Sequence, residues 1–318
     1  MARITSVRAG DFDALALEND HVRVVIIPEL GGRVWELTDR LRNRQWIWHR
    51  SGVSLSRVAP GSSYDDVWAG GWEELFPNDA AGRFEGRDLP DHGEWWTASW
   101  SVVPTHSDFP GIRLETLTSV RRTRCTKEVT LDGEAITVSY RIESLESEPF
   151  HCLFKQHLAI AVTPSCRLRL PGGTVTVVDP GFGTIVGAAD SFQWPSCTGS
   201  GGKVADLGSV SAPSLDTREF VYVEDLRAGW CGVDDLERRA SLRMAFDKAV
   251  LPFVWLFITY GGWRDCYTTV LEPCTNMPKD LDGAVRQGRS MELQPGQIFE
   301  TRVAVTLREL EAAASTTS

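Results

Sequence analysis

The feature that most constrains the fold is a long succession of β-forming segments joined by turn residues. In the clearest example, Asp132-Gly133 separates two β-rich runs, 125–131 and 136–142. An Asp-Gly pair between such runs predicts a β-hairpin, because both residues tolerate the φ values that a tight turn needs. The runs 13–18 and 22–27, separated by three polar residues, give a second hairpin signal.

Further β-forming runs continue almost to the end of the chain. They cover residues 34–38, 100–103, 112–120, 150–162, 167–170, 174–178, 219–223, 229–233, 240–246 and 253–259. A final hairpin is expected between 291–293 and 299–307, through Pro295-Gly296, and only 280–287 shows a helical pattern. Many strands with very little helix predict an all-β fold, an antiparallel sandwich of two large sheets with a concave face for a ligand.

The domain organisation is predicted to be simple. The 318 residues contain no evident linker, charge block or short repeat, and a hydrophobic content of 42% is ordinary for a globular protein. We therefore expect a single β-sandwich domain over residues 1–310. The small, polar residues 311–318 are expected to form a frayed C-terminal tail.

Composition excludes several classes of function. The net charge of −10, with no basic stripe, argues against nucleic-acid binding. No apolar stretch is long enough for a membrane span, and no signal-peptide pattern opens the chain. The seven Cys form no CxxC pair, so neither a zinc site nor a disulfide framework is indicated. The expectation is a cytoplasmic, reduced protein without metal or cofactor, and a homodimer is left open.

Glu272 is the first candidate for chemistry. It follows the apolar run 267–271, and Pro273 after it is expected to stop the strand from continuing as a paired central strand. Burial at the end of an apolar strand would raise the pKa of the carboxyl towards that of a useful general base. The plain alternative is a solvated Glu that caps a strand end.

Lys155 and His157 form the second candidate pair. They stand at i and i+2 within an apolar run, so on a strand they share a face. Since a charged Lys is almost never buried without a partner, that face is either exposed or lines a polar cavity. Lys155 would also lower the pKa of His157 by repulsion between like charges.

A third candidate region precedes and includes His92. Residues 51–90 form a long segment rich in Gly, Pro, Asp and Ser, of the kind that often lines a site. Gly93 lets the backbone turn after His92 and leaves the imidazole free to face a cavity. Trp95 and Trp96 follow, among twelve Trp in the chain. Their flat rings would suit the C–H faces of a sugar, and the alternative is an aromatic core.

Five segments in this order resemble the galactose mutarotase-like superfamily, in particular aldose 1-epimerase-like proteins. They span most of the chain and are Ile26-Ile27-Pro28-Glu29-Leu30-Gly31-Gly32-Arg33, Leu75-Phe76-Pro77-Asn78, Asp91-His92-Gly93, Lys155-Gln156-His157-Leu158, and Leu271-Glu272-Pro273-Cys274-Thr275 with its sequel Met291-Glu292-Leu293-Gln294-Pro295-Gly296.

The resemblance implies a β-supersandwich that interconverts the anomers of a sugar or sugar derivative without a cofactor. It implies that His157 is the general acid on the ring oxygen and Glu272 the general base on the anomeric hydroxyl. The residues after His157 and after Gly93 depart from the best-characterised members, which leaves the substrate open.

The substrate-binding candidates combine this resemblance with residue chemistry, and they are Arg33, Asn78, Arg83, His92, Trp95, Trp96 and Lys155. By the resemblance, His92 positions the substrate, and Asn78 and Arg83 stand where loop residues face the sugar. The basic side chains among the candidates hint at an anionic group on the substrate.

Two other classes of function fit the same fold. One is a carbohydrate-binding protein without turnover, and the other is a lyase or hydrolase. A glycosidase usually needs two carboxylates across the scissile bond, and Asp79, Asp91 and Glu94 are candidates for the second.

Overall fold

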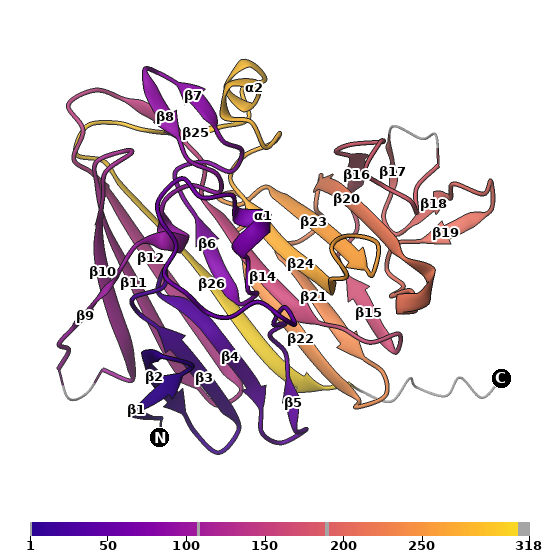
Figure 1. The fold of residues 1–318 in the computed structure, drawn as a ribbon, viewed down its shortest axis with the longest axis horizontal. Coiled ribbons are helices and arrows are strands. Elements are labelled where there is room, and N and C mark those ends of the chain that lie inside the picture. Colours follow the sequence, from indigo (N-terminus) through magenta and orange to yellow (C-terminus); the bar gives the residue numbers. More distant parts are fainter. Residues whose placement is uncertain (1, 107–108, 188–190, 311–318) are drawn as a thin grey trace.

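Two large antiparallel sheets make up most of the molecule (Figure 1). The structure, a computed structural model, describes residues 2–106, 109–187 and 191–310. Helix within these ranges is confined to four short elements, α1 (Tyr64–Val67), α2 (Leu281–Arg286) and the 3₁₀ turns η1 (Trp95–Thr97) and η2 (Pro213–Leu215). The predicted all-β, antiparallel fold with little helix is therefore confirmed, and the predicted tail, 311–318, lies outside the described residues.

The larger sheet has twelve strands, and the first strands of the chain form one edge of it. Its order is β1 (Arg3–Ala9), β2 (Phe12–Glu18), β3 (Val22–Ile27), β4 (Arg33–Asp39), β6 (Trp72–Leu75), β14 (Lys155–Ala161), β24 (Tyr267–Cys274), β23 (Phe253–Tyr260), β20 (Thr217–Glu224), β16 (Thr174–Val177) and β17 (Ser191–Gln193), with β5 (Arg44–Gln45) paired to β4.

The second sheet has eight strands, and three two-stranded sheets complete the fold. The eight-stranded order is β15 (Cys166–Arg169), β21 (Trp230–Asp235), β22 (Ala240–Phe246), β26 (Ile298–Glu309), β12 (Ala135–Ser144), β11 (Thr123–Asp132), β10 (Gly111–Thr118) and β9 (Ser101–Val103). The small pairs are β7 (Gly82–Phe84) with β8 (Arg87–Leu89), β13 (Phe150–Cys152) with β25 (Met291–Leu293), and β18 (Ser196–Thr198) with β19 (Val204–Asp206).

The main core lies between the two large sheets. Along β12 every second residue is buried, as expected for a strand with one face on a core. Those side chains join residues of β14 and β24, such as Leu158 and Leu271, in one apolar cluster. The opposite face of β14 and β24 is thereby free to build a site.

Local turn chemistry was predicted well, and strand pairing at long range was not. The hairpins β2–β3 and β11–β12 form as expected. The predicted final hairpin is wrong, because β25 pairs with β13 and β26 pairs with β12 and β22. The single run expected at 150–162 is divided into β13 and β14.

The expectation that Pro273 ends the pairing is also wrong. β24 continues through Pro273 to Cys274 in the middle of the larger sheet, between β14 and β23. The ladder to β14 pairs Lys155 with Cys274 and Leu158 with Leu271 but has no pair at the positions between. Proline has no N–H to donate there, and the sheet tolerates this local gap.

The long segment 51–90 contributes both to the larger sheet and to what covers it. It supplies α1, the sheet strand β6, and the separate β7–β8 pair, and Figure 1 places α1 over β6 and β14. The hydroxyl of Tyr64 in α1 bonds to side chains on both of these strands.

All seven cysteines are buried free thiols. None of the helices in the described ranges has the length and apolar character needed to cross a bilayer.

Candidate active site

A cavity of about 260 Å³ lies on the outer face of the larger sheet, beneath α1. It is at the small end of the range for ligand sites, which suits a small molecule. Its floor comes from the centre of the sheet and its walls from the segments around α1, β8, β16 and β23. The lining consists of Tyr64, Asp65, Trp68, Asp79, His92, Lys155, His157, Asp179, Phe182, Phe220, Phe257, Trp263, Glu272 and Lys279.

His157 and Glu272 occupy neighbouring positions on the cavity floor. The register that pairs Lys155 with Cys274 and Leu158 with Leu271 puts His157 opposite Glu272 on adjacent antiparallel strands. The ladder has no pair at this position itself, so the register on either side sets the two residues across from each other. Both side chains are at least 95% buried and both line the cavity. Two protonatable groups 115 residues apart in sequence therefore meet side by side.

Glu272 shares a buried ammonium group with Asp79. Nζ of Lys155 forms short ion pairs with Oδ2 of Asp79 and Oε2 of Glu272, and lies 4.2 Å from the centre of the Trp255 ring. Burial raises the pKa of Glu272, and the charge of Lys155 opposes that shift only in part. Burial also raises the pKa of Asp79, but here Lys155 and His92 outweigh it and the net shift is downward. Glu272 is thus the carboxyl of the two that more readily carries a proton.

His157 is held by Tyr64. Nδ1 of His157 lies 3.2 Å from the hydroxyl of Tyr64, which also makes a short hydrogen bond to Oε2 of Glu73. Burial lowers the pKa of His157 well below its usual value, and the nearby charge of Lys155 lowers it further. The expected direction of the Lys155 effect is confirmed, and the imidazole of His157 is neutral near neutral pH.

His92 faces the cavity from a left-handed turn. Its φ is +59° and that of Gly93 is +71°, and a Cβ on residue 93 would lie 2.3 Å from the carbonyl oxygen of Phe76. The turn expected from Gly93 is therefore present. The imidazole stacks on Tyr64 at 3.9 Å, and its Nδ1 lies 2.8 Å from Oδ1 of Asp91. Burial lowers the pKa of His92, but Asp79 and Asp91 more than offset this and raise it.

Aromatic rings form the walls. Trp68 makes edge contact with His157, and Trp263 packs against Trp68 and Phe257. Trp68 is 97% buried, so only part of one ring is available to a ligand. Rings of this kind offer an apolar wall to a ligand above the polar floor.

Several predicted binding residues lie outside this lining. Arg33 is buried and forms an ion pair with Glu73, behind Tyr64. Asn78 is buried and donates from Nδ2 to the carbonyl oxygen of Pro90 at 2.6 Å. Arg83 stands on the β7–β8 hairpin with 71% of its side chain exposed and faces Asp88. Each of these three side chains makes its contacts elsewhere, and none of them lines the cavity.

The two adjacent tryptophans also serve packing. Trp95 is fully buried and packs on Trp100 and Phe154 in the main core. Trp96 is buried behind the ring of Tyr64 and donates from Nε1 to the carbonyl oxygen of Asp91 at 3.1 Å. For these two rings, the alternative of an aromatic core describes their placement.

The charge of the cavity lining does not match the anionic substrate group that the sequence suggested. Its lining has four carboxylates, on Asp65, Asp79, Asp179 and Glu272, and two ammonium groups, on Lys155 and Lys279. The charge of Lys155 is already paired with Asp79 and Glu272, and carboxyl groups outnumber ammonium groups, so the lining is acidic. In the part of the chain that the structure describes, no group of three or more His, Cys, Asp or Glu is arranged to hold a metal ion.

Some lining residues were not identified as site residues from the sequence. Tyr64, Asp65 and Phe257 carried no motif, and Trp263 was one of twelve Trp with no local sign of exposure. The one usable signal was the long Gly- and Asp-rich segment, which supplies Tyr64, Asp65 and Trp68.

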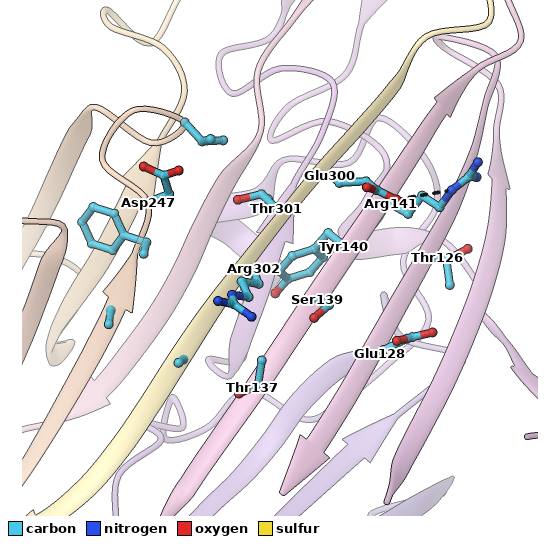
Figure 2. A pocket seen from close by; sticks show the side chains of 14 residues that line it. Thr126, Glu128, Thr137, Ser139, Tyr140, Arg141, Asp247, Glu300, Thr301 and Arg302 are labelled. Carbon is cyan, nitrogen blue, oxygen red and sulfur yellow. Dashed lines mark ion pairs between the residues drawn. The ribbon is translucent and has the colours of Figure 1, made fainter. Parts of the chain in front are cut away.

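A larger hollow of about 960 Å³ lies on the outer face of the eight-stranded sheet (Figure 2). Side chains of β11, β12 and β26 stand along it, and Arg141 forms an ion pair with Glu300 at 3.7 Å. Its charged groups are mostly solvated, and Tyr140 points its hydroxyl inward to Glu74 at 2.6 Å. We prefer the smaller cavity as the active-site candidate, because buried groups with shifted pKa values converge there.

Comparison with solved structures defines the class of fold. No protein-family model matches the sequence. The chain has the galactose mutarotase-like fold, since structures of that kind match it over almost their whole length. A galactose mutarotase-like protein from Clostridium acetobutylicum aligns with a TM-score of 0.69 at 12% identity, covering 97% of this chain and 99% of that one.

Two further structures give the same result. A galactose mutarotase related enzyme from Lactobacillus acidophilus aligns with a TM-score of 0.67 at 12% identity, covering 94% of this chain and all of that one. The Slr1438 protein from Synechocystis sp. PCC 6803 aligns with a TM-score of 0.69 at 14% identity, covering 96% and 98%. At these identities the likeness concerns the fold, and the expected supersandwich is confirmed.

Proposed function

We propose that this protein is a carbohydrate mutarotase of the aldose 1-epimerase type, which interconverts the anomers of a small sugar. The observation that carries the proposal is the meeting of His157 and Glu272 in facing positions on the floor of an aromatic-walled cavity. The match to a galactose mutarotase related enzyme supports it at the level of the fold.

The reaction suits this pair of side chains. Ring opening requires that the anomeric hydroxyl lose a proton while the ring oxygen gains one, and both oxygens are bonded to the same carbon. Neighbouring groups on one sheet face can therefore serve both atoms. Rotation about the C1–C2 bond and closure, with the protons returned, give the other anomer. A positioned acid or base contributes roughly 10²–10⁴-fold each.

Polarimetry tests the proposal. Freshly dissolved α-anomers of several neutral hexoses are followed with the wild-type protein, with Glu272→Gln and with His157→Asn. We expect acceleration by the wild type and a loss of at least about 100-fold in each variant. Glu300→Gln and His151→Asn are matched controls outside the cavity and should keep full activity.

Folding must be checked beside activity, because both target residues are buried. Circular dichroism and thermal unfolding of each variant show whether the loss is chemical. Wild-type protein that binds sugars but accelerates none of them would contradict the proposal.

A carbohydrate-binding protein without turnover is the second candidate. One observation favours it, namely that Lys155 holds a carboxylate oxygen of Glu272 in a short ion pair and could keep it from a substrate. Lys155 forms ion pairs with both Asp79 and Glu272, so neither carboxylate is free, which weakens the case for a two-carboxylate hydrolase. Release of the chromophore from chromogenic glycosides would instead support a hydrolase.

A further inference from the structure

Tyr64 connects the two histidines of the cavity. Its ring stacks on His92 with an interplanar angle of 7°, and its hydroxyl lies between Glu73 and Nδ1 of His157. Its backbone N–H donates to Oδ2 of Asp91 at 2.8 Å, the carboxylate whose other oxygen contacts His92. Tyr64 is 98% buried, so these contacts fix its position from several sides.

The hydrogen bonds around the Tyr64 hydroxyl have a preferred direction. One oxygen of Glu73 contacts the guanidinium of Arg33 and the other contacts the hydroxyl of Tyr64. A guanidinium can only donate, and an ionised carboxylate can only accept. Burial raises the pKa of Glu73, and the charge of Arg33 in direct contact opposes that shift and favours the ionised form. The single proton of Tyr64 therefore goes to Glu73. The reverse arrangement would need a protonated Glu73 beside the guanidinium of Arg33.

The direction of this bond determines the tautomer of His157. With its proton directed at Glu73, the oxygen of Tyr64 offers a lone pair to Nδ1 of His157, so Nδ1 must carry the proton of the neutral ring. The other ring nitrogen, Nε2, has no hydrogen-bond partner within the described ranges, and the ring lines the cavity.

We infer that Tyr64, held by Glu73 and Arg33, is a positioning residue that fixes His157 with its proton on Nδ1 and leaves Nε2 as a proton acceptor for the ligand. The role this gives His157 rests on the proposed function and reverses the roles implied by the family resemblance. The anomeric hydroxyl gives its proton to Nε2 as the C1=O1 double bond forms and the C1–O5 bond breaks. O5 takes its proton from the carboxyl of Glu272, and closure returns both protons.

The environments of the two groups agree with this assignment. Burial and the positive charge of Lys155 keep His157 unprotonated, whereas burial raises the pKa of Glu272 and Lys155, in contact with it, offsets that shift only in part. Groups whose surroundings push their pKa values apart in this way are suited to act as base and acid respectively.

Nitrogen NMR tests the tautomer without relying on turnover. The imidazole signals of ¹⁵N-labelled protein are recorded at pH 7, and the His157 signals are assigned by their absence in His157→Asn. We expect a protonated Nδ1 and an unprotonated Nε2. In Tyr64→Phe the acceptor is lost, and the ring should shift towards the Nε2–H form. A wild-type ring with its proton on Nε2 would overturn the inference.

A second variant reaches the same result by another route and covers the case in which Tyr64→Phe fails to fold. In Glu73→Gln the side-chain amide can donate to the oxygen of Tyr64, whose own proton then turns to Nδ1 of His157. That change also predicts the Nε2–H form. The control is Tyr260→Phe, which removes another buried hydroxyl, bonded to Thr269 at 3.0 Å, and should leave the His157 signals unchanged.

Kinetics supply the second readout. Because Tyr64 acts through His157, kcat of Tyr64→Phe should fall at least about tenfold while KM changes little. An unchanged tautomer in both variants contradicts the inference whatever the activity. Absence of turnover in the wild type, with the expected tautomer present, contradicts the proposed function and leaves the positioning of His157 standing.

Discussion

Lys155 is the residue on which the cavity floor depends. From the sequence, the strand face that carries Lys155 was expected either to be exposed or to line a polar cavity, since Lys without a partner is almost never buried. Lys155 is in fact buried and lines the cavity. Its two partners could not be identified, because Asp79 and Glu272 are distant in sequence and approach Lys155 only in the folded sheet. The same limit applies to Tyr64, whose role depends on a contact with His157 that no local pattern shows.

Replacing Lys155 by Met should destabilise the protein strongly. The change leaves the carboxylates of Asp79 and Glu272 buried without a counter-charge, and breaking a buried ion pair in this way typically costs about 3–5 kcal/mol. Urea unfolding measures the loss in the free energy of unfolding. Lys279→Met, at the exposed rim, is the control and should change stability by no more than about 0.5 kcal/mol.

The pH dependence of Lys155→Met follows from the same groups. Without the ammonium, burial raises the folded-state pKa of Asp79 and Glu272 above their unfolded values, so the folded state binds more protons. Stability should then fall as the pH rises through and above the unfolded carboxyl range near 4. In the wild type, the lowered pKa of Asp79 has the opposite effect, a contribution that is lost as the pH falls. A variant that gains stability between pH 4 and 7 would contradict this account.

The charge of the lining predicts discrimination by ligand charge. The carboxylates of Asp65, Asp79 and Asp179 and the carboxyl of Glu272 stand against two ammonium groups, and that of Lys155 is already paired with Asp79 and Glu272. A hexose phosphorylated at O6 should therefore bind more weakly than the free hexose. Titration calorimetry with both ligands measures the difference. Asp65→Asn removes one carboxylate that has no ion-pair partner within the described residues. It should reduce the difference in affinity between the free and the phosphorylated hexose. Tighter binding of the phosphate would show that Lys279 dominates.

At the scale of elements, β14 shows how one strand serves a site and a core. Lys155 and His157 face the cavity, while Gln156 accepts a hydrogen bond from Nε1 of Trp72 at 2.8 Å inside the sandwich. The period of two made this division predictable for the strand itself. The partners of β25 and β26 were not predictable, because a turn sequence such as Pro295-Gly296 does not reveal which distant strand offers the better apolar face.

A buried ion pair joins the two sheets beside β14. Nζ of Lys127 on β11 lies 2.7 and 2.8 Å from the two oxygens of Glu74 on β6, and both side chains are fully buried. Lys127→Met should lower the free energy of unfolding by about 3–5 kcal/mol, since it leaves the carboxylate of Glu74 in the core without a counter-charge, bonded only by the hydroxyl of Tyr140 among the described residues. Urea unfolding gives the value.

The double variant Lys127→Met with Glu74→Leu is the matched test of that reason. Replacing both partners removes the uncompensated charge, and the hydroxyl of Tyr140 can still reach Oε1 of Gln156 at 3.2 Å. We expect the double variant to be more stable than Lys127→Met alone. A double variant less stable than Lys127→Met alone would contradict this reason, because the loss would then not come from an uncompensated charge.

At the scale of the whole molecule, the two sheets share one core, which bears on the expected single domain. The main apolar cluster includes Leu17 near the start of the chain and Leu307 near its end, with Leu158 and Leu271 between them. The cavity floor belongs to the same strands as that core. The site should therefore not be separable from the sandwich as an independent folding unit, and the single domain over 1–310 stays a prediction that unfolding can test.

We predict one cooperative unfolding transition for the whole chain. Far-ultraviolet circular dichroism reports the strands of both sheets, and tryptophan fluorescence reports rings in the core, such as Trp46 and Trp72, together with Trp263 in the cavity wall. Because one cluster spans both sheets, the two signals should give the same urea midpoint and the same slope. A sugar that binds the cavity should move both midpoints upward together, since it binds only the folded state. Two separate transitions, with ligand shifting only one of them, would show that the cavity and part of the sandwich unfold as distinct units.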